Sequence, residues 1–134
     1  MSELHNIKKN SEDYLRNSLE VFEKNKLHID NIVKISNLCI EAIEKGNKLL
    51  FCGNGGSASD ANHLAAEIVG RFLKDRKPLP AISLTSNSSV LTALSNDFGY
   101  EKVFSKQVEA VGKDGDVIFL ISTSGKSQNI IDAA

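Results

Sequence analysis

The sequence has little of what marks a secreted, membrane-spanning or nucleic-acid-binding protein. Its two cysteines, Cys39 and Cys52, lack the spacing of a metal site, so we expect two free, buried thiols in a reducing cytosol. The net charge of -1 gives no strong field for nucleic acid or acidic membranes. No apolar run approaches the roughly 20 residues of a membrane-spanning helix, and residues 1–14 lack the apolar core of a secretion signal. We therefore expect a cytoplasmic protein without a nucleic-acid or membrane partner.

Two helical patterns fill residues 9–46 of this 134-residue chain. The first helix is predicted to begin after an N-cap at Asn10 or Ser11, and the second is predicted to end at Gly46. Their apolar surface is larger than one edge of a small sheet needs, so we expect the helix pair to serve subunit assembly. In the first helix this surface is formed by Tyr14, Leu15, Leu19 and Phe22.

Short apolar runs alternate with helical patterns in the rest of the chain. We predict strands at 48–52, 81–84 and 116–122, and helices at 60–72, 88–96, 101–111 and from 127 onward. This alternation predicts an α/β fold with a parallel, doubly wound sheet and helices on both faces. Residues 1–134 are expected to form a single domain with its sheet core in 48–134. Ligands bind at the carboxyl ends of such strands, where we expect loops rich in Ser, Thr, Asn or Gly at 53–59, 85–89 and 122–127.

The segment ISTSGKS (121–127) ends like a nucleotide-binding P-loop. The first glycine of that motif would fall on Leu120, and the loop is too short, so we do not assign a P-loop. Gly53, Gly55 and Ala58 fit a loose dinucleotide fingerprint. However, no acidic residue ends the second predicted strand to hold a ribose. We therefore expect no nucleotide cofactor.

Hydroxyl side chains crowd two of the strand-to-helix turns. Helix N-termini supply unpaired N–H donors and a positive dipole end, and small hydroxyl residues leave room for a phosphate. The alternative is that these residues only cap helices, but one cap needs one serine. Four hydroxyls within six residues favour a phosphate site, with Lys126 at its rim or in solvent. The two groups are Ser57 and Ser59 on one turn and Ser122, Thr123, Ser124 and Ser127 on the other.

Three motifs, in order, resemble the phosphoheptose isomerases (sedoheptulose 7-phosphate isomerases) of the sugar-isomerase (SIS) domain family. They are CGNGGSASDANHLAAE (52–67), SNDFGY (95–100) and STSGKSQN (122–129). The resemblance implies a three-layer α/β SIS domain with an N-terminal helix pair, in a homotetramer whose active sites lie between subunits. It also implies conversion of sedoheptulose 7-phosphate to D-glycero-D-manno-heptose 7-phosphate. That reaction is the first step of bacterial heptose synthesis for lipopolysaccharide or other surface glycans.

The resemblance also assigns residue roles. It implies that Ser57, Ser122, Ser124 and Ser127 bind the phosphate, and that Asn54, Gly55, Gly56, Asn96, Asp97 and Thr123 contact the sugar. His63 and Glu67 correspond to zinc ligands in the members that hold zinc, and Glu67 also to the catalytic base. Family members continue past Ala134 to a last helix whose glutamine and histidine would complete the zinc site. We therefore expect the chain to be truncated at its C-terminus.

The chemistry of an aldose–ketose isomerase fits the helix that carries Glu67. The reaction needs a base that moves a proton between adjacent carbons through a cis-enediol, and partial burial in an apolar helix suits a carboxylate for this task. His63 lies four residues earlier on the same face, so the pair could share a metal or form a plain hydrogen bond. Arg71, four residues later, is expected on that face too, paired with Glu67, with a substrate oxygen, or exposed. Asp97 is expected in a turn, as a turn former or a sugar-hydroxyl acceptor.

Two other functions compete with the enzyme. SIS domains also serve as sugar-phosphate sensors in transcription regulators, and some heptose-isomerase-like proteins bind the bacterial replication initiator. A non-catalytic sensor needs the serine loops but not His63 and Glu67 at helical spacing, which favours the enzyme. A third interpretation, an inactive or bifunctional fragment, rests only on the end of the chain at Ala134.

Overall fold

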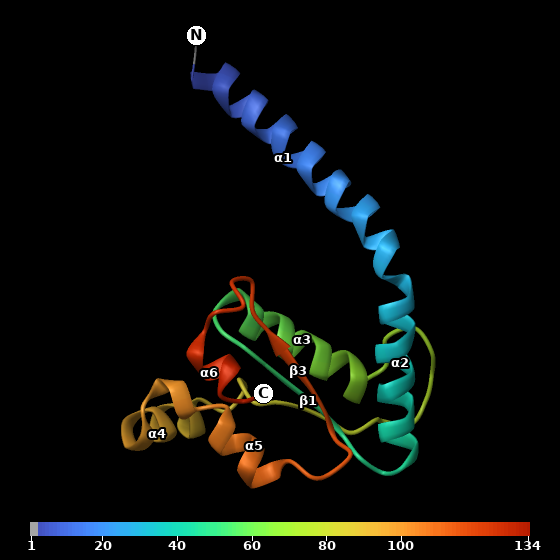
Figure 1. Ribbon diagram of the computed structural model, residues 1–134, viewed down its shortest axis with the longest axis vertical. Helices are drawn as coiled ribbons and strands as arrows, with labels where there is room; N and C mark the ends of the chain where they lie inside the picture. The colour runs from blue at the N-terminus through green and yellow to red at the C-terminus, as the bar shows by residue number, and fades with distance from the viewer. Residues whose placement is uncertain (1–2) are drawn as a thin grey trace. The chain divides into compact units, whose positions relative to one another are not determined.

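The computed structural model describes residues 3–134, and Figure 1 shows the course of the chain. The chain consists of two compact units, one ending at Asn37 and the other running from Leu38 to Ala134. The first unit is helical, and the second holds a three-stranded sheet with its covering helices.

The first helix begins earlier than the sequence pattern predicts. Helix α1 spans Glu3–Asn25, so the prediction of an N-cap at Asn10 or Ser11 is wrong. Ser11 lies within the helix, and its Oγ donates a hydrogen bond to the carbonyl oxygen of Ile7 at 2.9 Å. A serine in mid-helix can satisfy its hydroxyl on the carbonyl four residues back, which removes its value as a helix-start signal. Residues 3–9 contain no glycine or proline to stop the helix.

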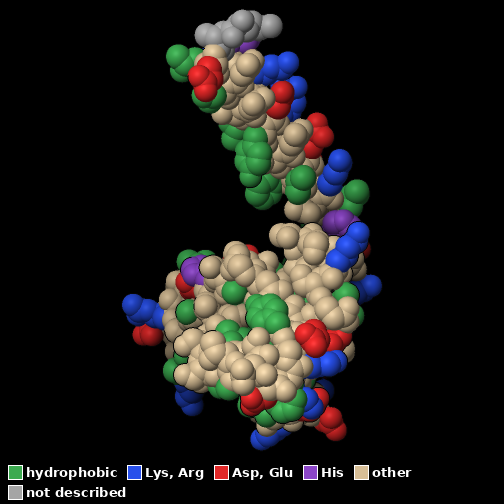
Figure 2. Space-filling model, turned by 90° about the vertical axis from the view of Figure 1, so that its left-hand side faces the viewer, with side chains coloured by type: hydrophobic (Ala, Val, Ile, Leu, Met, Phe, Trp, Pro, Cys, Tyr) green, Lys and Arg blue, Asp and Glu red, His purple; other side chains and the backbone are tan. Residues whose placement is uncertain are grey.

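The apolar side of α1 is not covered within the described chain. None of the side chains of α1 is buried, and Leu15 and Phe22 are 63% and 73% exposed. Figure 2 shows hydrophobic side chains gathered along one side of this helix. Leu4 and Ile7 add to the surface predicted from Tyr14 to Phe22, because they share its helical spacing. An isolated helix of this kind is marginal in water, so its apolar side needs a partner to be stable.

After a single 3-10 turn η1 (Lys26–His28), helix α2 spans Ile29–Glu44. Its predicted end is confirmed, because Gly46 follows in the left-handed region with φ of 81°. The part of α2 that belongs to the second unit buries Ala42 and packs Cys39 and Ile43 against the sheet.

The predicted parallel sheet is confirmed. Strands β1 (Leu49–Gly53), β2 (Ala81–Ser83) and β3 (Val117–Ile121) lie in the order β2-β1-β3, and both pairs are parallel. All five residues of the central strand β1 are buried, which is typical of a parallel strand covered on both faces. Because the strands are parallel, their carboxyl ends meet at one edge of the sheet.

Alternate residues of β1 point to two different cores. Leu50 and Cys52 pack with Val103, Phe104 and Ile130, on the face covered by three short helices. These helices are α4 (Ser88–Phe98), α5 (Ser105–Val111) and α6 (Gln128–Ile131), and a 3-10 turn η2 (Tyr100–Lys102) precedes α5. Helices thus cover this face of the sheet, as predicted.

The opposite core lies between the sheet and helix α3, which spans Gly56–Val69. Leu49 and Phe51 pack there against Ala61 and Ala65. The ring of Phe51 stacks on that of Phe119, its register partner in β3, with centroids 4.9 Å apart. The two cores confirm the helices on both faces that the alternation of strands and helices predicted, and they give the three-layer arrangement that the resemblance implied.

The cysteines behave as free thiols within the packed unit. Cys52 is fully buried and Cys39 is half-buried, so only Cys52 matches the expectation of a buried thiol completely. Burial raises the pKa of Cys52 to about 11 and also raises the pKa of Cys39. The uncharged thiol is therefore the stable form, and neither sulfur is an activated nucleophile. Across residues 3–134, no helix combines the length and apolar character that crossing a membrane requires.

Candidate functional site

A small cleft of about 60 Å³ lies at the carboxyl edge of the sheet. Its walls come from two loops, one after β1 and one after β3, which are far apart in the sequence. It is much smaller than the roughly 300–1,000 Å³ of pockets for drug-sized ligands, so it suits a single small group. Its lining residues are Asn54, Ser57, Ile121, Ser122, Thr123 and Ser127. Five of these six were predicted from the sequence to contact a phosphorylated sugar.

The loop after β1 is shorter than predicted, because α3 already begins at Gly56 rather than near residue 60. Gly53 makes this turn possible, since a Cβ at that position would lie 2.5 Å from the carbonyl oxygen of Ser57. Gly55 adopts φ of 55°, where other residues are strained. The tight turn places Ser57 in the first turn of α3, where its side chain is nearly buried and its backbone N–H donates to the carbonyl oxygen of Asn54 at 3.0 Å. Ser59, by contrast, is exposed.

Two hydroxyls of the loop after β3 stabilise the loop by accepting hydrogen bonds from its own backbone. The Oγ of Ser122 accepts the backbone N–H of Gly125 at 3.1 Å, and the Oγ of Ser124 accepts that of Lys126 at 3.2 Å. Gly125 turns the chain with φ of 63°. The two Oγ atoms also lie 3.5 Å apart, so one hydroxyl can donate to the other, and the second keeps its own O–H to donate. A phosphate oxygen needs donors, so this loop geometry still suits an anion. Lys126 is exposed, as predicted.

Helix capping does not explain Ser127. This residue occupies the N-cap position of α6, yet its side chain makes no capping hydrogen bond. In the same unit, Asn87 caps α4 by accepting the backbone N–H of Val90 at 3.1 Å. The hydroxyl of Ser127 therefore has no structural task at the helix start, and it lines the cleft instead.

His63 and Glu67 share one face of α3, as their spacing predicts. The Nε2 of His63 lies 3.7 Å from Oε1 of Glu67, and their side chains are 73% and 34% exposed. Glu67 is therefore partly buried, as expected for a carboxylate on this helix. Glu67 lies ten positions after Ser57, which corresponds to a backbone rise of about 15 Å along the helix axis. The carboxylate thus lies well away from the cleft at the start of α3.

The pair does not by itself make a zinc site. Zinc sites use at least three protein ligands, and residues 3–134 contain no group of three His, Cys, Asp or Glu side chains that could hold a metal. His63 and Glu67 supply suitable donor atoms but only two of them. Zinc binding would require a ligand from another part of the protein or from a second copy of the chain, so no chemical step is assigned to a metal here.

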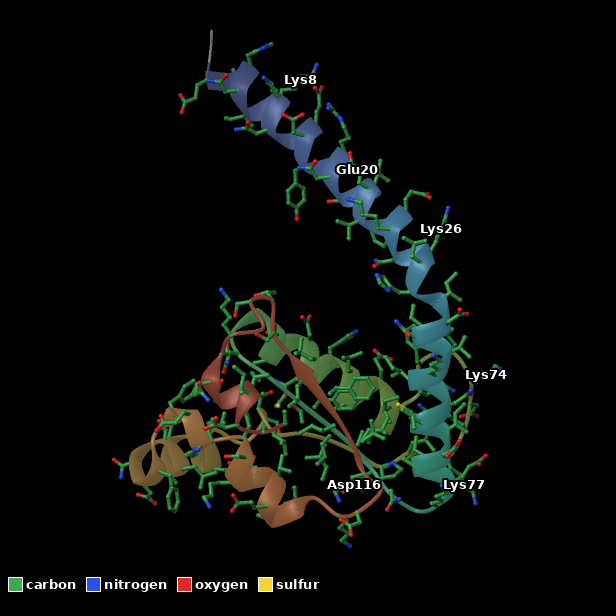
Figure 3. The ribbon with its side chains drawn as sticks, in the orientation of Figure 1. Lys8, Glu20, Lys26, Lys74, Lys77 and Asp116 are labelled. Atoms are coloured by element: carbon green, nitrogen blue, oxygen red, sulfur yellow. The ribbon has the colours of Figure 1, made fainter. Side chains whose placement is uncertain are left out.

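The end of α3 differs from the prediction. The helix ends at Val69 instead of Phe72, because Gly70 breaks it. Arg71 therefore lies outside the helix, and the expectation that it shares the face of Glu67 is wrong; its guanidinium lies 3.7 Å from the carboxylate of Asp75. Arg76 instead holds the helix end, donating to the carbonyl oxygen of Glu67 at 3.0 Å. Figure 3 marks Lys74 and Lys77 on the exposed segment that follows α3.

The second motif is connected to the cleft through a residue that the sequence analysis did not assign. Asn96 and Asp97 lie in the last turn of α4, so the prediction of a turn at Asp97 is wrong. Both are exposed, and the Nδ2 of Asn96 donates to Oδ1 of Asp97 at 3.1 Å; neither lines the cleft. Tyr100, at the end of the same motif, donates from its hydroxyl to Oδ1 of Asn54 at 2.9 Å.

Asn129 is a second residue that the sequence analysis did not single out. It lies on α6, is 3% exposed, and exchanges two hydrogen bonds with Asn54 across the two loops. Its signal in the sequence was weak, because it appeared only as the last letter of a motif. Gly55, Gly56 and Ser124 are exposed and, like His63 and Glu67, do not line the cleft.

Comparisons with known proteins agree with the fold. A model of the SIS domain matches residues 13–134. The phosphoheptose isomerase of a Nitratiruptor species is 47% identical over 130 residues, which cover 97% of this chain and 68% of that protein. The phosphoheptose isomerase of a Synechocystis species is 58% identical over 102 residues, covering 76% of this chain and 53% of that protein. The solved structure of phosphoheptose isomerase GmhA from Neisseria gonorrhoeae has a TM-score of 0.87 at 40% identity, covering 95% of this chain and 66% of that chain.

The fold and the cleft define a parallel α/β domain with a small cleft, lined mainly by hydroxyl and amide side chains, at the carboxyl edge of its sheet. With these matches, the chain belongs to the SIS-domain family, among the phosphoheptose isomerases. It spans about half to two thirds of the length of the curated relatives it matches.

Proposed function

We propose that this chain forms the phosphate-binding part of a ketose–aldose isomerase that converts sedoheptulose 7-phosphate to D-glycero-D-manno-heptose 7-phosphate. The observation that carries the proposal is the cleft that two distant loops form from Asn54, Ser57, Ser122, Thr123 and Ser127. Its hydroxyl and amide groups offer several donors within a volume suited to one phosphate. Names of similar proteins support the same reaction.

Each side chain has a task in this proposal. Ser57, Ser122, Ser124 and Ser127 hold the phosphate, while Asn54, Gly55, Gly56, Asn96, Asp97 and Thr123 contact the sugar. Glu67 acts as the base, taking the proton from C1 of the open-chain ketose. The electrons of the C–H bond form the C1=C2 bond of a cis-enediol as the C2 oxygen takes up a proton. Return of a proton to C2 and loss of the O1 proton then give the aldose.

The separation of the cleft from Glu67 supports a long substrate. In a heptose 7-phosphate, the reacting carbons C1 and C2 lie at the opposite end of the carbon chain from the phosphate. Ser57 and Glu67 likewise lie at opposite ends of α3. A site that binds one end of the substrate and catalyses the reaction at the other end uses the binding energy of the phosphate to position the distant carbons.

The exposed apolar side of α1 supports assembly with further copies of this chain. We propose a homotetramer whose active sites lie between subunits, acting in the cytoplasm to supply heptose for lipopolysaccharide or other surface glycans. A second copy would cover the exposed side chains of α1, such as Leu15 and Phe22, and would also be one source of a further zinc ligand beside His63 and Glu67.

The proposal is tested by proton exchange in D2O. The chain is incubated with sedoheptulose 7-phosphate, with zinc or with a chelator, and the C1 protons are followed by NMR. We expect exchange in the parent chain and none in Glu67→Gln, while Glu44→Gln, a change at an exposed glutamate of α2, exchanges like the parent. Binding without exchange would favour a sugar-phosphate sensor or a replication-initiator partner. Absence of both binding and exchange would contradict the assignment of the serine loops.

A further inference from the structure

Asn54 and Asn129 form a reciprocal amide pair between the two loops of the cleft. The Nδ2 of Asn54 donates to Oδ1 of Asn129 at 2.8 Å, and the Nδ2 of Asn129 donates to Oδ1 of Asn54 at 2.9 Å. The two residues are 75 positions apart in the sequence. Asn129 is almost completely buried, so its side chain is held in place by packing as well as by the pair. The pair therefore fixes the position of the loop after β1 relative to α6.

Tyr100 completes the set of partners around Asn54. Its hydroxyl donates to Oδ1 of Asn54 at 2.9 Å, the same oxygen that accepts from Asn129. The 3-10 turn that carries Tyr100 is itself joined to the chain after α6, because Lys102 and Asp132 form an ion pair with a 2.7 Å separation. Asn129 and Tyr100, the two partners of Asn54, thus lie on α6 and η2, and the Lys102–Asp132 ion pair joins η2 to the residue that follows α6.

These contacts limit what Asn54 can offer to a ligand. A side-chain amide has two acceptor lone pairs on its oxygen and two N–H donors on its nitrogen. In Asn54 both lone pairs are engaged, by Asn129 and by Tyr100, and one N–H is engaged by Asn129. A single N–H donor remains. Since Asn54 lines the cleft, it can present a donor there but no acceptor.

We propose that Asn129 and Tyr100 are positioning residues that make Asn54 a donor-only group toward an oxyanion in the cleft. This inference rests on the proposed phosphate site, and it adds that the site selects for ligand groups that accept hydrogen bonds. Phosphate monoester dianions have only acceptor oxygens, so a fixed donor suits them. A protonated group that must donate its hydrogen finds no acceptor on Asn54, and a sugar hydroxyl can contact Asn54 only by accepting from it.

The test is the affinity for inorganic phosphate, measured by titration with ¹⁵N-labelled chain and the backbone amide signals of Gly125 and Lys126. We expect Tyr100→Phe to bind phosphate about 3- to 10-fold more weakly, which corresponds to the loss of one hydrogen bond. Tyr100 is 54% exposed, so this change is compatible with folding. Asn87→Asp, which keeps its helix cap outside the cleft, should bind like the parent.

A double-mutant cycle separates positioning from a general structural effect. If Tyr100 acts through Asn54, adding Tyr100→Phe to Asn54→Ala should change the phosphate affinity by less than about 2-fold. Asn129→Asp provides a second measure. The carboxylate of the new aspartate cannot donate to Asn54, but the protonated carboxyl group can. The phosphate affinity of Asn129→Asp, compared with that of the parent at the same pH, should therefore recover as the pH is lowered.

The outcomes distinguish this inference from the proposed function. Phosphate binding by the parent that both Tyr100→Phe and Asn129→Asp leave unchanged would overturn the inference and leave the phosphate site intact. Equal losses from Tyr100→Phe in the presence and absence of Asn54 would also overturn it, because the effect would not pass through Asn54. A parent chain that does not bind phosphate would overturn the proposed site, and the inference with it. Should Asn129→Asp fail to fold, the cycle with Tyr100→Phe decides alone.

Discussion

Lys48 and Asp116 join the amino ends of two neighbouring strands. The ammonium of Lys48 lies 2.5 Å from Oδ2 of Asp116, and the backbone N–H of Lys48 donates to Oδ1 at 2.9 Å. The backbone N–H of Lys113 adds a third bond at 2.8 Å. Figure 3 marks Asp116 directly before β3, at the end of the strand opposite to the loop of the cleft. With side chains 16% and 6% exposed, this is a partly buried ion pair that joins the starts of β1 and β3.

We expect Asp116→Ala to lower the free energy of unfolding by roughly 2–3 kcal/mol at neutral pH, because it leaves a partly shielded ammonium and two N–H groups without their acceptor. Urea unfolding followed by circular dichroism measures the change. Asp75→Ala is the matched control, since Asp75 is exposed and its ion pair with Arg71 is long; a change within about 0.5 kcal/mol is expected there. Equal effects of the two substitutions would contradict the stabilising role of the Lys48–Asp116 pair.

The same pair should make stability depend on pH in a defined direction. Burial raises the pKa of Asp116, but hydrogen bonds from the Lys48 side chain and from the backbone N–H groups of Lys48 and Lys113 outweigh it, so the pKa lies below its ordinary value. The stabilisation is therefore fully present above the unfolded-state pKa of about 4, and it is lost as the pH falls through the lower pKa of the folded state. The difference between parent and Asp116→Ala should shrink below about pH 4.

Gly53→Ala should disturb the turn at the cleft. A Cβ at Gly53 would lie 2.5 Å from the carbonyl oxygen and 2.7 Å from the Cβ of Ser57, whereas one at Gly56 would meet no atom within 4 Å. We expect Gly53→Ala to destabilise the fold by about 1–3 kcal/mol, the cost of overpacking, and Gly56→Ala to leave stability nearly unchanged. Thermal unfolding of both variants measures the contrast. Comparable melting temperatures would show that the turn accommodates a side chain at either position.

Ser127→Ala and Asn87→Ala should each impair a different property, phosphate binding in the first variant and stability in the second. Ser127 lines the cleft without capping α6, so its loss should weaken phosphate binding about 10-fold, the effect of one hydrogen bond to a charged group, with little change in stability. Asn87 caps α4, so its loss should cost about 1 kcal/mol of stability without affecting phosphate binding. Isothermal titration and urea unfolding, applied to both variants, measure the two properties. If Ser127→Ala destabilised the chain as a cap deletion does, the capping interpretation would be restored.

Leu15→Asp should reduce the assembly of the chain. Leu15 lies on the exposed apolar side of α1, where a carboxylate would be buried by a second copy. We expect a lower mass by analytical ultracentrifugation than for the parent. Asn17→Asp adds the same charge at an exposed position on the other side of the helix and should leave the mass unchanged. A parent chain that sediments as a monomer at all concentrations would argue against assembly through α1.

The sequence alone was sufficient for the order of strands and helices in the second unit, but not for all of their bounds. The apolar run at β1, the alternation of strands with helices and the glycine after α2 are local signals, and they predicted a parallel sheet whose serine-rich loops share one edge. Local signals failed to predict where α1 and α3 begin, because more than one starting residue is compatible with each helix. Residues 3–9 can extend a helix without any cap, and Gly56 can begin one directly after a tight turn.

The tertiary structure decided which side chains meet at the cleft. Asn54 and Asn129 pair across 75 residues, and Tyr100 reaches Asn54 from a different motif. No periodicity or spacing encodes such contacts, because they depend on how three loops are brought together by the sheet. Sequence determined that hydroxyl-rich loops would follow β1 and β3. Packing of the strands and of α6 decided which of their polar groups face one another, because a buried amide must find its partner wherever the fold places it.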